Sequence, residues 1–363
     1  MIINKLELNN FRNYAKEKIE FDKGINIIYG DNAQGKTNIL EAIFVGALGK
    51  SFRTNKDKEM INVGTDLASA QSHVEIFAEK EDREIKIKYE INEKKVFYIN
   101  DIQINKTSDI LGNLYVVLFV PEDISILKNE PNRRRRFLNI MISQLRPVYV
   151  HVLNQYNKTL EQRNSYLKQI KFDGKADDIL DIWDEQLVKL GIKIYNYRKE
   201  FIEKINEKIK EIHLKSTHNK ENVEIVYNSN IKEEEYLNKI KENRKEDIQK
   251  GYTSIGIHRD DFETYINKQE ISIYGSQGQK RTTIISLKLA EAEVIYDEIG
   301  ERPVMLLDDF MSELDKKRIQ GFLENIKNNQ VLITCTDSFS IPNTEYNLYK
   351  VTNASIETIA KQL

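Results

Sequence analysis

Residues 30–37 read Gly30-Asp31-Asn32-Ala33-Gln34-Gly35-Lys36-Thr37 and fit the phosphate-binding pattern G-x-x-x-x-G-K-[ST]. A predicted strand at 25–29 precedes this stretch, and an apolar pattern of helical period follows it to about residue 44. A strand before the loop and a helix after it are the context that a P-loop requires. The stretch therefore predicts an α/β fold with a nucleotide site, whereas a chance Gly-rich turn would lack these flanking elements.

Each part of the motif has a physical task. The glycines let the backbone curl, so that its N–H groups face the phosphates. We expect Lys36 to reach the β- and γ-phosphates and Thr37 to place its hydroxyl on Mg²⁺. The positive end of the helix that follows adds a favourable dipole for a bound anion.

A second chemical signal lies far along the chain, where Asp308 and Asp309 follow the apolar run 304–307. A P-loop enzyme needs a carboxylate at the end of a buried strand to hold its metal, directly or through water. Asp308 is the natural Mg²⁺ partner, and Asp309 is placed to orient or polarise an attacking water. Two aspartates can also cap a turn, but the buried strand before them favours the metal-binding role.

Most of the chain separates Lys36 from Asp308, as is natural if a lobe interrupts the domain. Just before the second strand, residues 274–281 contain Ser276 and Gly278 at the start of a predicted long helix. A hydroxyl, small glycines and a helix N-terminus form a second anion site. Because the P-loop already holds the phosphates, this second site becomes useful if it closes on the γ-phosphate of a neighbouring subunit.

Hydrophobic periodicity divides the rest of the chain. In residues 72–105, apolar and polar side chains alternate with a period of two, which predicts an antiparallel meander with one solvent-exposed face. Helices are expected from Pro131 to about Lys168, with Pro147 as a kink or second start, and at 233–249. From Trp183 to Ile212 apolar residues recur in steps of 4-3-4-3-4, a seam that we interpret as bundle core.

Strand and helix signals alternate again after residue 250. The expected elements are a short strand at 254–257, a hairpin at 265–274, helices at 279–299 and 316–325, and buried strands at 304–307 and 331–334. Short apolar runs between helices are typical of a parallel sheet that is covered on both faces. The predicted domains are a discontinuous head, 1–125 with 251–363, and an inserted helical lobe, 126–250.

Composition excludes several classes of protein. In 363 residues, 40% hydrophobic and 31% charged side chains exclude wholesale disorder. The longest apolar runs fall far short of the roughly 20 residues that span a bilayer. With no secretory signal visible and one cysteine, Cys335, a cytoplasmic protein is expected. The net charge of −2 argues against coating DNA by bulk charge, but it leaves room for a local basic face.

Candidate DNA contacts lie in two basic stretches. Four arginines, Arg133, Arg134, Arg135 and Arg136, fill the first turn of a predicted helix, where the dipole disfavours cations. They are expected to meet something acidic, either DNA phosphates or neighbouring carboxylates, and both options stay open. Arg53 and Lys56 form a second, modest patch, and the roles of His258 and Arg259 stay open as well. Binding through phosphates and shape would be sensitive to salt and largely independent of sequence.

Two motifs carry a resemblance to known proteins. Ser276-Gln277-Gly278-Gln279 resembles the signature motif of ABC-type ATPases, and Ser312-Glu313-Leu314-Asp315 resembles their D-loop. As a whole the chain resembles the RecF family, whose head is related to those of SMC proteins. The supporting stretches run from near the start to Asp315: Asn9–Tyr14, Arg133–Leu138, Gln162–Asn164, Gly256–Asp261, Gly275–Gln279 and Leu306–Asp309.

The resemblance implies a P-loop ABC-type ATPase head with an antiparallel β subdomain and an inserted α-helical lobe. It also implies that ATP is sandwiched between the P-loop of one head and the signature motif of another. The expected assembly is an ATP-dependent homodimer that clamps DNA at gaps or single-strand/duplex junctions and separates after hydrolysis. With RecO- and RecR-type partners, it would help to load the recombinase. Arg12 would lie near the phosphates, and Ser276, Asp309 and Asp315 would serve catalysis.

Departures from the wider ABC pattern predict slow hydrolysis. Asp309 stands where transporters usually carry a glutamate base, and Thr336 where they carry a switch histidine. The missing histidine also argues against a transporter's motor subunit. An SMC-like DNA organiser needs a long coiled coil, whereas the seam of about 30 residues would span only roughly 45 Å. A P-loop phosphotransferase remains an alternative, although it has no use for Ser276 or Asp315.

Overall fold

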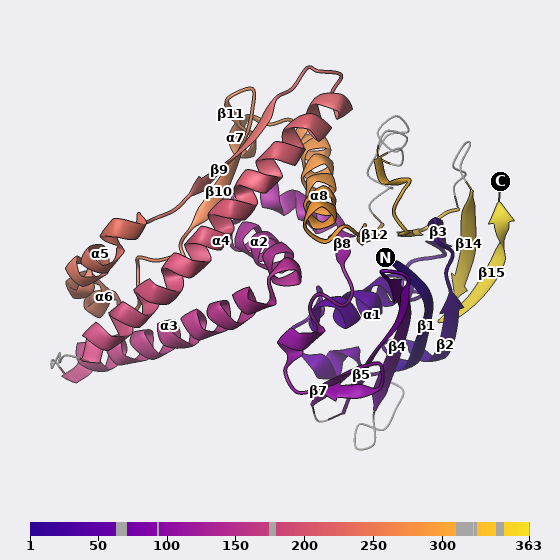
Figure 1. The fold of residues 1–363 in the computed structure, drawn as a ribbon, viewed down its shortest axis with the longest axis horizontal. Helices are drawn as coiled ribbons and strands as arrows, with labels where there is room; N and C mark the ends of the chain where they lie inside the picture. The colour runs from indigo at the N-terminus through magenta and orange to yellow at the C-terminus, as the bar shows by residue number, and fades with distance from the viewer. Residues whose placement is uncertain are drawn as a thin grey trace. The chain divides into compact units, whose positions relative to one another are not determined.

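The structure, a computed structural model, describes residues 1–62, 71–92, 94–173, 179–309, 322, 325–338 and 345–362. The chain forms two compact units: the first comprises 1–124 with 281–363, and the second comprises 125–280 (Figure 1). Among the described helices, none combines the length and the hydrophobicity that crossing a membrane demands.

The first unit contains an antiparallel sheet in the order β2-β1-β4-β5-β6-β7. Its strands are β1 (Ile2–Phe11), β2 (Tyr14–Glu20), β4 (Ser72–Lys80), β5 (Arg83–Ile91), β6 (Lys95–Ile99) and β7 (Ile102–Ile104). Alternate residues of β4, such as Val74, Ile76 and Ala78, are buried, while those between them are partly exposed. The meander predicted for residues 72–105 is confirmed.

A second sheet of the same unit has the order β15-β14-β3-β13-β12-β8, with every pair parallel except β14 and β15. Its strands are β3 (Ile25–Tyr29), β8 (Val116–Phe119), β12 (Val304–Asp308), β13 (Val331–Cys335), β14 (Tyr346–Thr352) and β15 (Ser355–Gln362). The strands predicted at 25–29, 304–307 and 331–334 are confirmed, and the structure shows that they are neighbours in this sheet. Sequence reasoning did not identify β8, β14 or β15.

Helix α1 (Lys36–Leu48) packs between the two sheets, because it contacts β1, β4 and β5 of one and β8, β12 and β13 of the other. A helix covered on both sides must be apolar all round, and the segment 39–47 is buried throughout. Other helical elements described in this unit include η1 (Asp57–Met60), η2 (Thr107–Ile110) and most of α8 (Gln277–Ile299). The long helix predicted at 279–299 is confirmed, whereas most of the predicted 316–325 helix lies outside the described residues.

The second unit is a helical lobe with a small sheet. It contains η3 (Pro121–Leu127), which starts in the first unit, α2 (Pro131–Leu145), α3 (Pro147–Asp173), α4 (Ile179–Ser216), β9 (Val223–Asn228), β10 (Asp261–Ile266), β11 (Gln269–Glu270) and α7 (Ile271–Tyr274). Pro147 thus begins a separate helix. Figure 1 shows α4 as the long helix of the lobe, packed beside α3. Its seam residues Leu187, Ile194, Phe201, Ile205 and Ile209 are buried, as expected of bundle core.

Three expectations for the lobe were wrong in detail. The helix predicted at 233–249 is interrupted at Asn243, giving η4 (Glu233–Glu235), α5 (Tyr236–Glu242) and α6 (Arg244–Lys250). Residues 254–257 form no strand, because the backbone N–H of Ser254 donates to Asp247 and that of Gly256 to Asn230. The hairpin predicted at 265–274 is shorter, since the chain turns into α7 after β11.

The lobe also extends further along the chain than the predicted boundary at residue 250. Strand β9 pairs along its whole length with β10 in antiparallel register, from Val223 opposite Ile266 to Asn228 opposite Asp261. This long-range pairing groups residues 251–280 with the lobe, so the compact unit ends at Lys280.

A buried ion network ties the lobe's helices together. The fully buried guanidinium of Arg163 on α3 donates to Asp184 on α4 at 2.6 Å and to Asp247 on α6 at 2.7 Å. Arg244 adds a second cation to Asp184. Because an unpaired buried charge is strongly unfavourable, such a network holds the three helices in one arrangement.

Candidate nucleotide site

Two glycines allow the P-loop to pass close to its neighbours. Gly30 and Gly35 have φ angles of 154° and 116°, which other residues rarely adopt. A β-carbon at Gly30 would lie 2.3 Å from the carbonyl oxygen of Val351, and one at Gly35 would lie 2.7 Å from the side-chain amide of Asn13. The path of the loop therefore depends on glycine at both ends of the motif.

Two hairpin turns hold the loop in place at Gln34. The side-chain amide of Asn13, in the β1–β2 turn, donates to the backbone oxygen of Gln34 at 2.8 Å. From the β14–β15 turn, the N–H of Asn353 donates to the side-chain oxygen of Gln34 at 2.5 Å. Asn38 on α1 completes the clamp by donating to Asn13 at 2.7 Å. The loop is thus preorganised by segments from both ends of the chain.

Lys36 lies at the mouth of this loop, largely buried. Its ammonium donates to the carbonyl oxygens of Gly30 at 2.5 Å and Asp31 at 2.8 Å. The positive charge is therefore held beside the N-terminus of α1, whose free N–H groups also favour an anion.

The two predicted metal-binding residues come together from opposite parts of the chain. The Thr37 hydroxyl on α1 donates to Asp308 Oδ1 at the end of β12, at 2.8 Å. Burial raises the pKa of the Asp308 carboxyl, and hydrogen bonds from Thr37 and Thr334 partly oppose that rise. A hydroxyl and one carboxylate beside a phosphate loop fit the way Mg²⁺ binds proteins, with phosphate and water oxygens completing its shell. The residues present therefore fit a nucleotide with Mg²⁺.

Thr334, in the neighbouring strand β13, organises both aspartates. Its hydroxyl donates to Asp308 Oδ1 at 2.8 Å and accepts from the backbone N–H of Asp309 at 3.0 Å. Asp309 turns out of the strand with a left-handed φ of 47°, a conformation that Asp tolerates better than most residues. Sequence reasoning missed Thr334, although a hydroxyl within the buried run 331–335 was a usable signal.

A buried carboxylate beside the loop holds two arginines. Glu41 on α1 is fully buried and accepts from Arg12 at 2.8 and 2.6 Å and from Arg53 at 3.3 Å. Arg53 also donates to Asn38 at 2.7 Å, and its charge partly opposes the rise in the pKa of Asp308 that burial causes. Both arginines thus lie beside the P-loop helix. Glu41 was missed, although it is the sole acid in the apolar α1 sequence.

The signature-like segment forms the N-terminal cap of α8. The Ser276 N–H donates to Gln279 Oε1 at 2.9 Å, and the Gln279 N–H donates to Ser276 Oγ at 3.2 Å. This reciprocal pattern is a capping box. The cap uses an acceptor lone pair of the exposed Ser276 hydroxyl, which leaves its proton available to an anion. Asp315 and the rest of the D-loop-like segment lie outside the described residues.

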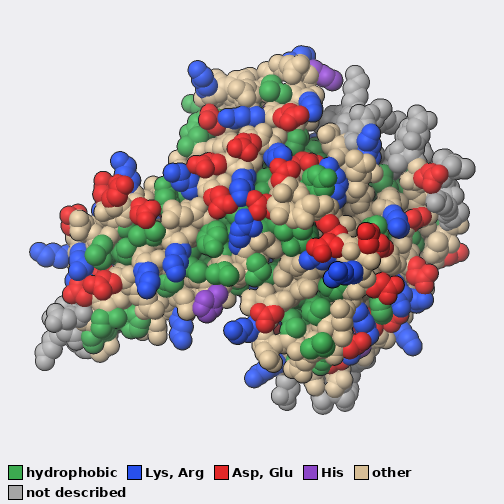
Figure 2. Space-filling model, in the orientation of Figure 1, with side chains coloured by type: hydrophobic (Ala, Val, Ile, Leu, Met, Phe, Trp, Pro, Cys, Tyr) green, Lys and Arg blue, Asp and Glu red, His purple; other side chains and the backbone are tan. Residues whose placement is uncertain are grey.

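The four arginines at the start of α2 differ in their surroundings. Arg134 is largely buried and makes two 2.6 Å bonds to the carboxylate of Asp261, while Arg135 donates to the backbone oxygen of Asp260 at 2.8 Å. Arg133 and Arg136 are exposed. On the face shown in Figure 2, positive and negative side chains of the described residues are interspersed. Arg134 and Arg135 therefore serve contacts within the lobe.

Replacing Arg134 by glutamine should lower the free energy of unfolding of the lobe by about 3 kcal/mol, because it leaves the Asp261 carboxylate without its partner. Replacing the exposed Arg133 should change it by less than about 0.5 kcal/mol. Urea unfolding midpoints of the two variants test the contrast. Equal midpoints would contradict a structural role for Arg134.

His258 is held in one neutral form within the lobe. Its Nε2 lies 3.1 Å from the carbonyl oxygen of Thr253, which can only accept, so Nδ1 accepts from the Tyr156 hydroxyl at 2.8 Å. Burial lowers the pKa of His258 from 6.5 to about 4, and nearby arginine charges add to the shift. His258 therefore takes part in hydrogen bonds within the lobe.

This lowered pKa predicts a loss of stability in acid. Below pH 6.5 the unfolded chain binds a proton at His258 that the folded chain rejects until about pH 4. The contribution is present above pH 6.5 and falls by about 2 kcal/mol at pH 5. Urea midpoints at pH 7 and 5 should therefore differ more in the wild type than in His258→Gln, with the exposed His151→Gln as control. The same pH dependence in all three proteins would refute this linkage.

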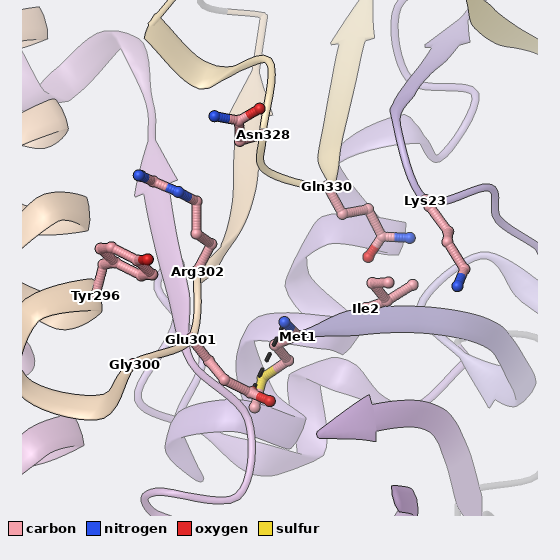
Figure 3. Close-up of a pocket in the computed structure, with 9 residues that line it drawn as sticks. All are labelled: Met1, Ile2, Lys23, Tyr296, Gly300, Glu301, Arg302, Asn328 and Gln330. Carbon is pink, nitrogen blue, oxygen red and sulfur yellow. Dashed lines mark ion pairs between the residues drawn. The ribbon is translucent and has the colours of Figure 1, made fainter. Parts of the chain in front are cut away.

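One cavity of about 540 Å³ lies elsewhere in the first unit (Figure 3). Its lining includes Lys23, Arg302 and Gln330, which directly precede or lie shortly before strands β3, β12 and β13. The cavity thus lies at the amino ends of these parallel strands, whereas the P-loop and Asp308 follow their carboxyl ends. Ligands of open α/β sheets bind at the carboxyl ends, so this cavity is separate from the nucleotide site.

Comparison with known proteins gives a consistent result over the whole chain. Residues 2–359 match the family model of the RecF/RecN/SMC N terminal domain. The DNA replication and repair protein RecF of Acetivibrio thermocellus is 44% identical, covering 96% of this chain and 97% of that protein. RecF of Lachnoclostridium phytofermentans is 42% identical, with 98% and 99% covered.

Comparison with solved structures supports the same family assignment. The recombination mediator protein RecF-ATPrS in the RecFOR pathway superposes with a TM-score of 0.91 at 36% identity, over 99% of this chain and 98% of that one. An SmcHead bound to the C-winged helix domain of ScpA has a TM-score of 0.58 at 18% identity, over 99% and 97% of the two chains. The predicted fold, an ABC-type ATPase head with an antiparallel subdomain and a helical lobe, is confirmed.

Proposed function

The chain belongs to the RecF family, and on that premise we propose that it is an ATP-dependent DNA-binding protein of recombinational DNA repair. The observation that carries the proposal is the 2.8 Å hydrogen bond between Thr37 and Asp308. It joins the P-loop to an acidic strand end from the far part of the sequence, as an ATPase requires. The name of the relatives and the ATP analogue in the solved RecF structure support the same role.

In this proposal ATP occupies the loop 30–37. The backbone N–H groups and Lys36 bind the phosphates, while Thr37 and Asp308 hold Mg²⁺, which would neutralise the charge on the transferred phosphoryl group. Asp309 orients the attacking water. Because its carboxylate is one methylene shorter than that of a glutamate base, hydrolysis is slow and acts as a timed switch.

The second half of the site comes from another copy of the chain. Ser276 offers a hydroxyl proton at the start of α8. Ile273 and Tyr274 of α7, separated from Ser276 by Gly275, are 65% and 68% exposed. Large exposed apolar side chains beside an anion site favour contact with a partner surface. ATP binding would join two heads, and hydrolysis would release them.

DNA is bound by the joined heads at gaps or single-strand/duplex junctions, through phosphates rather than bases. The exposed cations Arg133, Arg136, Arg53 and Lys56 are the proposed contacts. Because basic and acidic side chains are mixed, we expect modest affinity with a marked dependence on salt. RecO- and RecR-type proteins are the proposed protein partners. We expect DNA to stimulate ATP hydrolysis, and we expect the protein to be located in the cytoplasm.

The rival functions fit less well. A phosphotransferase has no use for the capped Ser276 segment, and the comparisons match RecF proteins over the full chain. An SMC-like organiser needs a far longer arm than α4, whose 38 residues span about 57 Å.

The solution mass tests the proposal directly. Light scattering would compare the protein without nucleotide, with ADP and with ATP–Mg²⁺, and each state would be repeated with gapped duplex DNA. A monomer that dimerises only with ATP–Mg²⁺ and then retains DNA is the expected result. A solution mass that is the same with and without nucleotide would refute the ATP site shared between two subunits.

A further inference from the structure

The turn between α4 and β9 lies against the signature-like segment. Glu221, in this turn, accepts a hydrogen bond at 3.0 Å from the side-chain nitrogen of Gln279. Gln279 is the residue whose side-chain oxygen accepts the Ser276 N–H in the capping box. All three residues belong to the second unit. One acid from the turn after α4 thus contacts the cap of α8.

The chemistry of this contact fixes the orientation of the Gln279 amide. An ionised carboxylate only accepts hydrogen bonds, so the amide nitrogen must face Glu221. The amide oxygen then faces the N–H of Ser276, as the capping box requires. In the reversed orientation, two donors would face each other at Ser276, and an oxygen would face the carboxylate.

Glu221 is itself held by the last turn of α4. Its Oε2 lies 3.3 Å from Nε2 of the buried His213, and its N–H donates to Thr217 Oγ1 at 3.3 Å. Thr217 in turn donates to the backbone oxygen of His213 at 2.8 Å. The position of Glu221 is therefore set by the C-terminal end of the longest helix of the lobe.

We propose that Glu221 is a positioning residue for the signature segment. It fixes the Gln279 amide, and through that amide the capping box that aims the Ser276 hydroxyl at the γ-phosphate held by the other subunit. This inference rests on the proposed shared ATP site. Through this contact, the C-terminal end of α4 acts on ATP hydrolysis.

The first test compares Glu221→Ala with Glu221→Gln. Glu221→Ala should leave ATP binding by the monomer unchanged and lower turnover at saturating ATP about tenfold, the effect of one lost charge-assisted hydrogen bond. Glu221→Gln should keep most of the turnover, because its side-chain oxygen still accepts from Gln279. Glu224→Ala removes an exposed acid of β9 and serves as the matched control. Normal turnover in Glu221→Ala would overturn the inference.

A mixing experiment separates positioning from misfolding. In a mixed dimer of Glu221→Ala and Lys36→Ala, the intact P-loop of the first chain faces the intact signature segment of the second. Turnover of the mixture should exceed the sum of the two proteins measured alone. Ser276→Ala, which removes the hydroxyl without adding bulk at the interface, mixed with Lys36→Ala sets the reference. Recovery in the reference but not with Glu221→Ala would overturn the positioning role. If turnover does not recover in the reference mixture, the proposed shared ATP site is wrong, and this inference fails with it.

Discussion

Replacing Lys36 by alanine is expected to abolish tight ATP binding and to lower turnover by about 10²–10³-fold, the typical effect of removing one preorganised electrostatic group. The ammonium lies 2.5 and 2.8 Å from the carbonyl oxygens of Gly30 and Asp31, at the mouth of the loop. A phosphate chain there would lose its one direct cationic contact from the motif. The backbone N–H groups remain in Lys36→Ala, but they carry only partial charges.

Titration with a fluorescent ATP analogue and steady-state hydrolysis would measure the two effects. Lys50→Ala is the matched control, because Lys50 is exposed just beyond the other end of α1. Circular dichroism should confirm that both variants fold. ATP affinity of Lys36→Ala equal to that of the control would remove the assignment of residues 30–37 as the nucleotide site.

The nucleotide half of the site was predictable because its signals are local. The P-loop is a continuous motif between a strand and a helix, and Asp308 follows four consecutive buried residues. Thr334 and Glu41 were missed because their roles appear only when partners distant in sequence are brought together. Thr334 meets Asp308 through strand pairing, and Glu41 on α1 meets Arg12 of the β1–β2 turn.

The same distinction explains the strands that were missed. β14 pairs in parallel with β3 across most of the chain, and such pairing depends on tertiary context more than on local preference. The turn after it is Asn353-Ala354, both with positive φ, and it lacks the glycine that usually marks a hairpin. β8 is only four residues long, and a short apolar run does not reveal whether it forms strand or helix.

For the arginines at 133–136, the sequence alone could not identify the acidic partners, because these are set by the fold. Four cations at a helix start did predict an acidic partner, but the sequence could not choose between DNA and carboxylates. Strand β10 places Asp261 against Arg134, which settles the partner of that one residue. Asp260, the residue before β10, accepts a hydrogen bond from Arg135 through its backbone oxygen, while Arg133 stays exposed.

Ser276→Arg should spare ATP binding by the monomer, prevent the ATP-dependent dimer and reduce turnover about 100-fold or more. Losing the N-cap costs about 1 kcal/mol, too little to unfold the chain. The exposed position accepts the larger side chain in the monomer, whereas in a shared site its bulk would occupy the space of the partner's phosphate. The effect therefore falls on assembly rather than on the subunit's own nucleotide site.

Light scattering with ATP–Mg²⁺ and nucleotide titration at low protein concentration would separate these two effects. Ser276→Thr is the matched control, because it keeps a hydroxyl that can both cap α8 and donate to a phosphate. It should dimerise with ATP and retain most of its turnover. A normal ATP-dependent dimer of Ser276→Arg would show that the start of α8 does not face the partner's nucleotide. Loss of ATP binding by the monomer would show instead that Ser276 serves the P-loop of its own chain.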